Sequence, residues 1–120
     1  MTIEGVNFDK LGQLVVDAVH AGVECMFLYV EFDEGVIAPS LYHFCDGQLF
    51  RVEPTDDVFD ELFALQERLG SEVRAMVFEV QGDRFDTRLV YADRFDASSD
   101  KAARTKNMLQ ARFGRTDVGF

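Results

Sequence analysis

Residues 25–53 constrain the fold of this chain most, because they form three apolar segments separated by two glycine-containing turns. In the first segment Met26, Leu28 and Val30 alternate with aromatic residues and one carboxylate, which is the period of two expected of a β-strand. The turns contain Asp-Glu-Gly and Asp-Gly, and Asp-Gly between apolar runs is a strong hairpin signal. The sequence therefore predicts a β-meander with strands over residues 25–32, 40–45 and 48–52.

Two helices are predicted around the meander. The first begins at Asn7 or Asp9, has apolar residues at i, i+3, i+4 and i+7 along one face, and ends at Gly22. The second begins at Thr55 or Asp56, either of which can cap it. The apolar residues that we expect this second helix to bury are Val58, Phe59, Leu62, Phe63, Leu65 and Leu69.

A second hairpin and a last helix follow. Alternating apolar and polar residues predict strands over 75–81 and 84–91, with a glycine turn between them. One of three capping residues at 98–100 can begin the last helix, whose weak apolar stripe ends at Gly114. The tail at 115–120 is expected to be loose.

The predicted order of elements is α-β-β-β-α-β-β-α. Strands joined by short turns form antiparallel sheets, and helices then cover the sheet. The prediction is a single α+β domain over residues 1–120, with two layers: an antiparallel five-stranded sheet, covered by helices on one face. A chain of 120 residues with 48% hydrophobic residues can bury a sufficient core without a metal ion or a disulfide.

Charge is distributed unevenly along the chain. Residues 1–67 contain 14 acidic residues and only Lys10 and Arg51 as basic ones, whereas residues 68–120 contain 8 acidic and 10 basic residues, so the net charges are −12 and +2. Nucleic-acid binding rests on Lys and Arg that neutralise phosphates, so this imbalance argues against a nucleic-acid partner. It suits a basic protein partner that is steered by a negative face. Acidity that serves only solubility is an equally good interpretation.

Hydrophobic runs, the N-terminal sequence and the two cysteines indicate the cellular compartment. No apolar run approaches the roughly 20 residues that span a membrane. The N-terminus lacks the basic and apolar regions of a secretion signal, so we expect a cytoplasmic protein without a membrane partner. Cys25 and Cys45 lie in apolar strands, which favours buried thiols, although a pair facing each other across the sheet also fits the sequence.

Residues typical of catalysis are few. His43 and Cys45 are two positions apart on one predicted strand and would point the same way, which permits a dyad but more simply indicates packing on one sheet face. His20 lies near a helix end. The cysteines lack zinc-site spacing, and the acidic residues of the second helix lack the calcium-loop pattern. The sequence therefore predicts no catalytic, metal-binding or cofactor-binding residues.

Several segments together resemble one known family. Residues 26–31 read Met-Phe-Leu-Tyr-Val-Glu, the second helix reads DDVFDELFALQERL, and the second hairpin has an apolar strand, a glycine turn and an aromatic residue before Tyr91. Over about residues 11–113 this order resembles the YezG-like family of immunity proteins, antitoxins that protect bacteria from polymorphic secreted toxins. The chain differs from many members in having no tryptophan, and Ala92 interrupts the acidic run after Tyr91.

The resemblance implies that the protein binds a cognate toxin domain and blocks it in the cytoplasm of the producing cell. Many such toxins are nucleases with basic clefts, and an acidic surface can compete for such a cleft and associate quickly. The resemblance assigns no contact residues, so charge and expected exposure select them. The candidates are Glu31, Asp33, Glu34, Asp46, Glu53, Asp57, Asp60 and Glu61, with Tyr29 and Tyr42 as aromatic anchors if one sheet face is open; a core role for the tyrosines is the simpler interpretation.

Two other functions remain open. A small-ligand or nucleotide-binding regulatory domain requires a concave pocket with convergent polar groups between helices and sheet. An enzyme that uses His43 and Cys45 requires an exposed, reactive thiol. The sequence predicts no particular oligomeric state.

Overall fold

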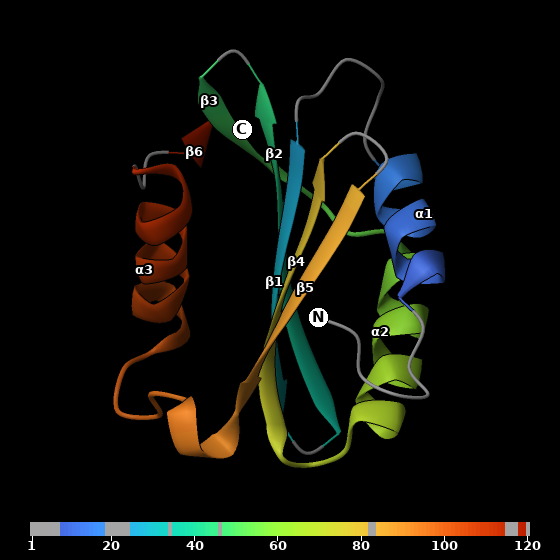
Figure 1. Cartoon of the computed structure of the whole chain (residues 1–120), viewed down its shortest axis with the longest axis vertical. Helices are drawn as coiled ribbons and strands as arrows, with labels where there is room; N and C mark the ends of the chain where they lie inside the picture. Colours follow the sequence, from blue (N-terminus) through green and yellow to red (C-terminus); the bar gives the residue numbers. More distant parts are fainter. Residues whose placement is uncertain are drawn as a thin grey trace.

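The computed structural model of the protein describes residues 8–18, 25–33, 35–45, 47–81, 84–114 and 118–119. A sheet lies between helices that cover both of its faces (Figure 1). The helices and the five antiparallel strands follow the predicted order, which confirms the α+β class. The elements are α1 (Asp9–Ala18), β1 (Cys25–Asp33), β2 (Val36–Cys45), β3 (Gln48–Val52), α2 (Asp56–Leu69), β4 (Val73–Gln81), β5 (Arg84–Tyr91), the 3₁₀ helix η1 (Ala92–Arg94), α3 (Lys101–Phe113) and β6 (Val118–Gly119).

Strand β1 joins the meander to the second hairpin in one sheet. The strand order is β5-β4-β1-β2-β3-β6, and β1 pairs antiparallel with β2 and with β4. Gly35 and Gly47 have φ angles of 66° and 76° at the two turns of the meander, a conformation that glycine adopts without steric cost. The tail expected to be loose instead contributes β6, which pairs in parallel with β3, so that prediction is wrong for residues 118–119.

Strand β2 is longer than predicted. It begins at Val36, and Pro39 lies opposite Val30 of β1. Within the described residues, β3 pairs with β2 only from Leu41 onward, so Pro39 lies in a segment with a neighbour strand on one side. Proline lacks an N–H group but is tolerated there, because no second ladder requires the missing donor.

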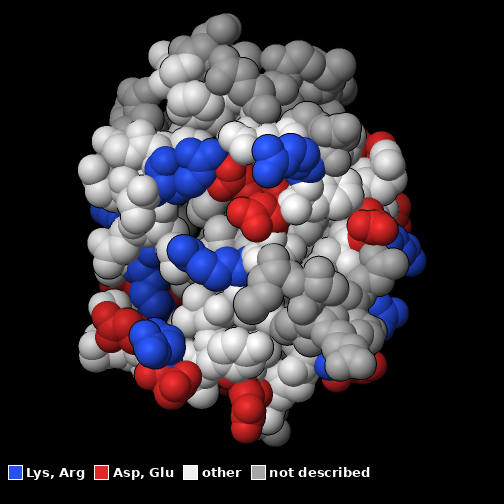
Figure 2. Space-filling view, in the orientation of Figure 1, with Lys and Arg blue, Asp and Glu red and all other residues white. Residues whose placement is uncertain are grey.

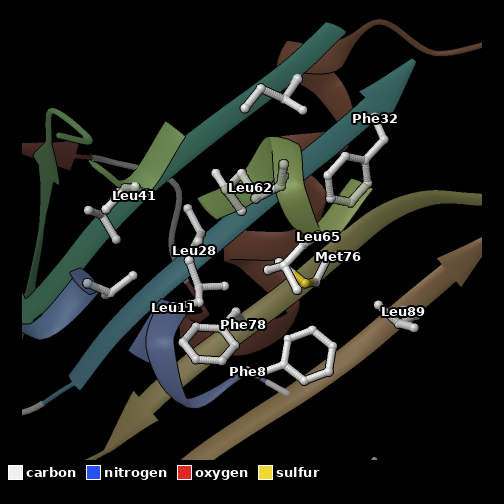
Figure 3. Packing of buried hydrophobic residues seen from close by; sticks show 14 of the residues in the cluster. Phe8, Leu11, Leu28, Phe32, Leu41, Leu62, Leu65, Met76, Phe78 and Leu89 are labelled. Atoms are coloured by element: carbon white, nitrogen blue, oxygen red, sulfur yellow. The ribbon is translucent and has the colours of Figure 1, made fainter. Parts of the chain in front are cut away.

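Helices α1 and α2 cover the first face of the sheet. Figure 3 shows Leu28 and Phe78 of the sheet beside Leu11 of α1 and Leu65 of α2. All four side chains are fully buried. Burial of one such side chain stabilises the fold by about 1.5–3 kcal/mol, so this mainly aliphatic cluster is the principal core.

Helix α3 covers the second face, so the prediction of two layers with helices on one face is wrong (Figure 1). The Phe113 ring of α3 lies 5.4 Å from the Phe27 ring, edge to face, and stacks on the Phe44 ring at 5.2 Å. The strands of the meander carry rings on both faces, and a single helical layer would leave one set in water. The buried apolar residues on this side are Phe27, Tyr29, Tyr42, Leu49, Ala75, Val77 and Leu109.

Two helix caps match the predicted candidates. Thr55 Oγ1 accepts a hydrogen bond from the Val58 N–H at 3.2 Å, and Asp100 Oδ1 accepts one from the Ala103 N–H at 2.8 Å. Each such cap contributes about 1 kcal/mol. The predicted boundaries of the first helix at residues 7 and 22, and the turn at 82–83, lie outside the described residues. None of the described helices combines the length and the apolar character needed to cross a membrane.

Gly12 lets α1 approach β5 closely. A Cβ atom at this position would lie only 2.3 Å from Cε2 of the Phe85 ring. The Phe85 ring in turn lies 5.8 Å from the Phe78 ring in the core. The missing side chain in α1 therefore positions the edge strand of the sheet.

Candidate partner-binding surface

The outward face of α2 combines acidic residues with an exposed aromatic ring. Helix α2 buries Val58, Leu62 and Leu65 toward the sheet. With 3.6 residues per turn, one set of positions lies directly opposite this buried stripe. We call this set, Asp56, Asp60, Phe63 and Glu67, the α2 outer stripe. All of its members are exposed, and 44% of the Phe63 surface is accessible.

The carboxylates of the α2 outer stripe are not neutralised within the described part of the chain. None of the ion pairs found there includes Asp56, Asp60 or Glu67. Asp57 on the same helix and Glu53 just before it are exposed as well. This surface therefore offers an apolar contact and a negative potential at the same place.

The prediction that α2 buries Phe63 is wrong. On a helical wheel Phe63 lies about 100° from Leu62 and about 140° from Val58, outside the buried stripe. Leu69, which was expected in the same stripe, does pack against the core. The helical spacing places Phe63 outside the buried stripe, whereas the prediction of burial relied only on the apolar character of its side chain.

The prediction that Glu61 is an exposed contact residue is also wrong. Its side chain is buried where α1 meets α2. The carboxylate oxygens lie 3.7 Å from Lys10 Nζ and 3.9 Å from Arg68 Nη1. Glu61 is therefore occupied within the protein and is not available to a partner.

Glu31, predicted at an exposed turn, is buried beneath α3, which corrects that prediction too. Arg104 donates two hydrogen bonds to its carboxylate, from Nε at 2.6 Å and from Nη2 at 2.9 Å. The Tyr29 hydroxyl donates a third, at 2.6 Å. Nearby, Lys101 Nζ donates to Ser40 Oγ at 2.8 Å. These contacts join α3 to β1 and β2.

The surroundings fix the protonation of this group at neutral pH. Burial alone would raise the pKa of Glu31, but the hydrogen bonds from Arg104 and Tyr29 outweigh it and lower the pKa below the ordinary value of 4.5. Burial, and then the hydrogen bond to Glu31, raise the pKa of Tyr29 well above its ordinary value. Glu31 is therefore ionised and Tyr29 is protonated, as the hydrogen bonds between them require.

The two tyrosines proposed as anchors belong to the core. Tyr29 and Tyr42 are buried under α3, which confirms the simpler interpretation of both. Of the predicted acidic contact residues, Glu34 and Asp46 lie outside the described residues. Those that the structure places at the surface are Asp33, Glu53, Asp57 and Asp60.

Asp33 lies beside the C-terminal end of α2. The Gln66 side-chain amide donates to the Asp33 backbone carbonyl at 2.6 Å. Asp33 and Glu67 line a pocket of about 610 Å³ next to the last turn of α2, whose carbonyl groups carry partial negative charge. Arg74 also lines this pocket, and its Nε donates to the Phe32 carbonyl at 3.2 Å. The pocket brings the first turn of the meander next to the α2 outer stripe.

His43 lies on the face covered by α1 and α2, opposite Met26. Its ring stacks on Phe50 at 5.0 Å, and its Nδ1 atom is buried without a hydrogen-bond partner among the described residues. The Cys45 side chain and His20 lie outside the described residues. Within the described residues, no cluster of three or more His, Cys, Asp or Glu side chains could hold a metal ion.

Comparison with models of known protein families gives no match to this chain, and comparison with curated proteins gives no significant match. The resemblance described above therefore stays a prediction.

Proposed function

We propose that this protein is an immunity protein that binds a cognate secreted toxin domain, and that the α2 outer stripe is its contact surface. The observation that carries the proposal is the exposed Phe63 ring, which lies between Asp60 and Glu67 on a helix face whose carboxylates form no ion pair with a described residue. A basic toxin domain, such as a nuclease with a positive cleft, complements this surface. The resemblance to the YezG-like family gives independent support.

Each part of the surface has a separate role in binding. The carboxylates accelerate the encounter with a basic partner, an effect that decreases as salt rises. The Phe63 ring, once buried in the partner, provides the desolvated anchor on which most of the binding free energy of such interfaces depends. The pocket lined by Asp33, Glu67 and Arg74 can accept a polar side chain of the partner at the edge of the contact.

The test is co-expression with the toxin encoded beside this gene. We expect the pair to co-purify and the producing cells to survive. Phe63→Ala should weaken binding by at least tenfold, mainly through faster dissociation. Asp60→Lys should slow association, and rising salt should reduce the difference between this variant and wild type.

Phe59→Ala is the matched control, because Phe59 lies on the same helix but packs against the core. Its effect should be on stability and not on affinity at a temperature where it is folded. A toxin that neither binds nor is neutralised would refute the proposal. Binding that survives both Phe63→Ala and Asp60→Lys would refute the assignment of the surface.

A small-ligand regulatory domain is the second candidate, and the pocket beside α2 is the observation in its favour. Its volume lies within the range of about 300–1,000 Å³ that is common for ligand sites. Such sites are lined mostly by apolar residues. This pocket is lined mainly by polar and charged residues, and its large apolar side chains are Phe32 and Val73. A screen of metabolites by thermal shift tests this candidate. Glu67→Gln should weaken the binding of a ligand in this pocket, whereas Phe63→Ala should not alter it, because Phe63 does not line the pocket.

A further inference from the structure

Strand β5 forms an edge of the sheet that no described strand covers. It pairs with β4 on one side and is the last strand in the order β5-β4-β1-β2-β3-β6. In Figure 1 it crosses in front of the other strands. The free backbone N–H and C=O groups of an edge strand are a template for another strand. Its length of eight residues is enough for a specific pairing.

The charges on β5 are poorly matched within the chain. Asp86 lies opposite Glu79 of β4, whose carboxylate Arg112 already holds with hydrogen bonds of 2.7 and 2.5 Å. Arg88 donates to the sulfur of Met108 at 3.6 Å. Neither Asp86 nor Arg88 takes part in an ion pair with another described residue. Both are exposed and would gain from a strand with the opposite charge order.

Figure 2 shows the face of the molecule that carries this edge, where acidic and basic side chains lie next to one another around a hollow. Asp86, Arg88 and Arg112 line a cleft of about 270 Å³ between β5 and α3. The unmatched charges therefore lie at an accessible place.

The geometry of antiparallel pairing limits how two copies of β5 can meet. Directly opposite residues must point to the same face. The two-fold axis must therefore lie at a position where one residue faces its own copy, and we name the axis after that residue. An axis through Thr87 puts Asp86 of each copy opposite Arg88 of the other, Phe85 opposite Leu89, and Thr87 opposite itself. An axis through Asp86 or Arg88 would place that residue opposite its own copy and oppose like charges.

We infer that the protein forms a symmetric dimer in which two β5 strands pair antiparallel about Thr87 and join the two sheets into one. Each dimer contains two Asp86–Arg88 pairs on the α3 side and a Phe85–Leu89 contact on each side of the axis on the opposite face. Threonine pairs and opposite charges are favourable cross-strand neighbours. Two-fold symmetric dimers are the commonest closed assemblies. The interface does not include the α2 outer stripe.

Charge exchange tests the register. Asp86→Arg puts basic residues at both positions 86 and 88, and Arg88→Asp puts acidic residues at both, so each variant opposes like charges in its own dimer. Each should weaken dimerisation on the order of tenfold or more, measured by sedimentation equilibrium and by light scattering after gel filtration. An equimolar mixture of the two variants should dimerise again, because the basic strand of one then faces the acidic strand of the other.

Controls carry the same charge changes away from the edge. Asp57→Arg on α2 and Lys106→Asp on α3 change exposed residues that form no ion pair within the described part of the chain, and both variants should leave the dimer intact. Circular dichroism verifies that all variants are folded. Wild-type protein that is monomeric at hundreds of micromolar, a dimer that survives both edge variants, or a mixture that stays monomeric overturns the inference. Because the dimer does not use Phe63, Phe63→Ala should leave it unchanged, so this test is independent of toxin binding.

Discussion

The two faces of the sheet are covered by different means. The α1 and α2 face depends on a mainly aliphatic cluster around Leu28 and Phe78. The α3 face combines aromatic rings with the Glu31–Arg104 and Glu79–Arg112 pairs. Aliphatic packing has no preferred direction, whereas an arginine that grips a carboxylate with two hydrogen bonds fixes position and angle. Stability should therefore depend on shape on one face and on ionisation on the other.

The ion pairs also change how the uneven charge of the sequence is interpreted. The acidic first part of the chain and the basic second part meet under α3, where Arg104 neutralises Glu31. Arg68 similarly approaches Glu61. Part of the charge segregation in the sequence therefore disappears in the fold. The carboxylates of the α2 outer stripe form no ion pair with a described residue and surround an exposed ring, which is why the partner proposal concentrates there.

Phe78→Ala should produce the largest effect, and it tests the apolar packing on the α1 and α2 face. The ring is fully buried between the Phe8 and Phe85 rings, with centroids 6.5 and 5.8 Å away. Its removal should reduce the free energy of unfolding by about 3–5 kcal/mol, measured by urea denaturation. The half-buried Phe113 on the α3 side is the matched variant, and Phe113→Ala should cost about 2 kcal/mol. Equal costs would contradict the difference between the faces.

Arg104→Met tests the ionic side. The variant leaves the Glu31 carboxylate buried without its cation, so the free energy of unfolding should fall by about 3 kcal/mol. Amide exchange within α3 should accelerate more than exchange within α2. The double variant Glu31→Met with Arg104→Met should recover much of the loss, because no buried charge remains. Lys106→Met, an exposed position on the same helix, is the control and should change stability by less than about 0.5 kcal/mol.

Gly12→Ala tests how strictly shape matters on the α1 side. The new Cβ atom would lie 2.3 Å from the Phe85 ring, so the ring must move. Overpacking of about 1–3 kcal/mol should outweigh the gain of about 1 kcal/mol in helix propensity. Gln13→Ala on the exposed side of α1 is the control. If Gly12→Ala stabilises the protein in thermal unfolding, the close approach of α1 and β5 is not a constraint.

Several elements were predictable from sequence because local rules decide them. The Asp-Gly turn and the half-exposed pattern after it predict a strand over 48–52, the bounds that β3 has, and Thr55 caps α2 as one of two predicted candidates. The partner of Glu31 was not predictable, since Arg104 lies 73 positions away and only the fold brings them together. The second helical layer was also missed, although the rings at Phe27 and Tyr29 signalled that this face of β1 is covered. Long-range pairing thus decided which acidic candidates stay exposed.

Acid should destabilise the α3 face through the protonation of Glu31. The pKa of Glu31 is lowered in the folded protein, so the unfolded state binds its proton more readily. The stabilisation is complete above pH 4.5 and is lost as the pH falls through the folded-state pKa. Urea denaturation across this range should show a steeper decline for wild type than for Glu31→Gln. Parallel curves would mean that the Arg104 pair does not contribute to acid sensitivity.

His43 should give the smallest effect, at a milder pH and on the opposite face. Burial lowers the pKa of His43 below 6.5, because the Nδ1 atom has no described hydrogen-bond partner and a charged ring would lose its hydration. The unfolded state therefore takes up this proton first as the pH falls. Stability is complete above pH 6.5 and declines from there toward the folded-state pKa. His43→Phe keeps a ring to stack on Phe50 and removes the titration, so its free energy of unfolding should stay constant across this window while that of wild type falls. A wild-type curve that is flat below pH 6.5 would show that His43 is hydrated in the folded state, and acid sensitivity would then belong to the α3 face alone.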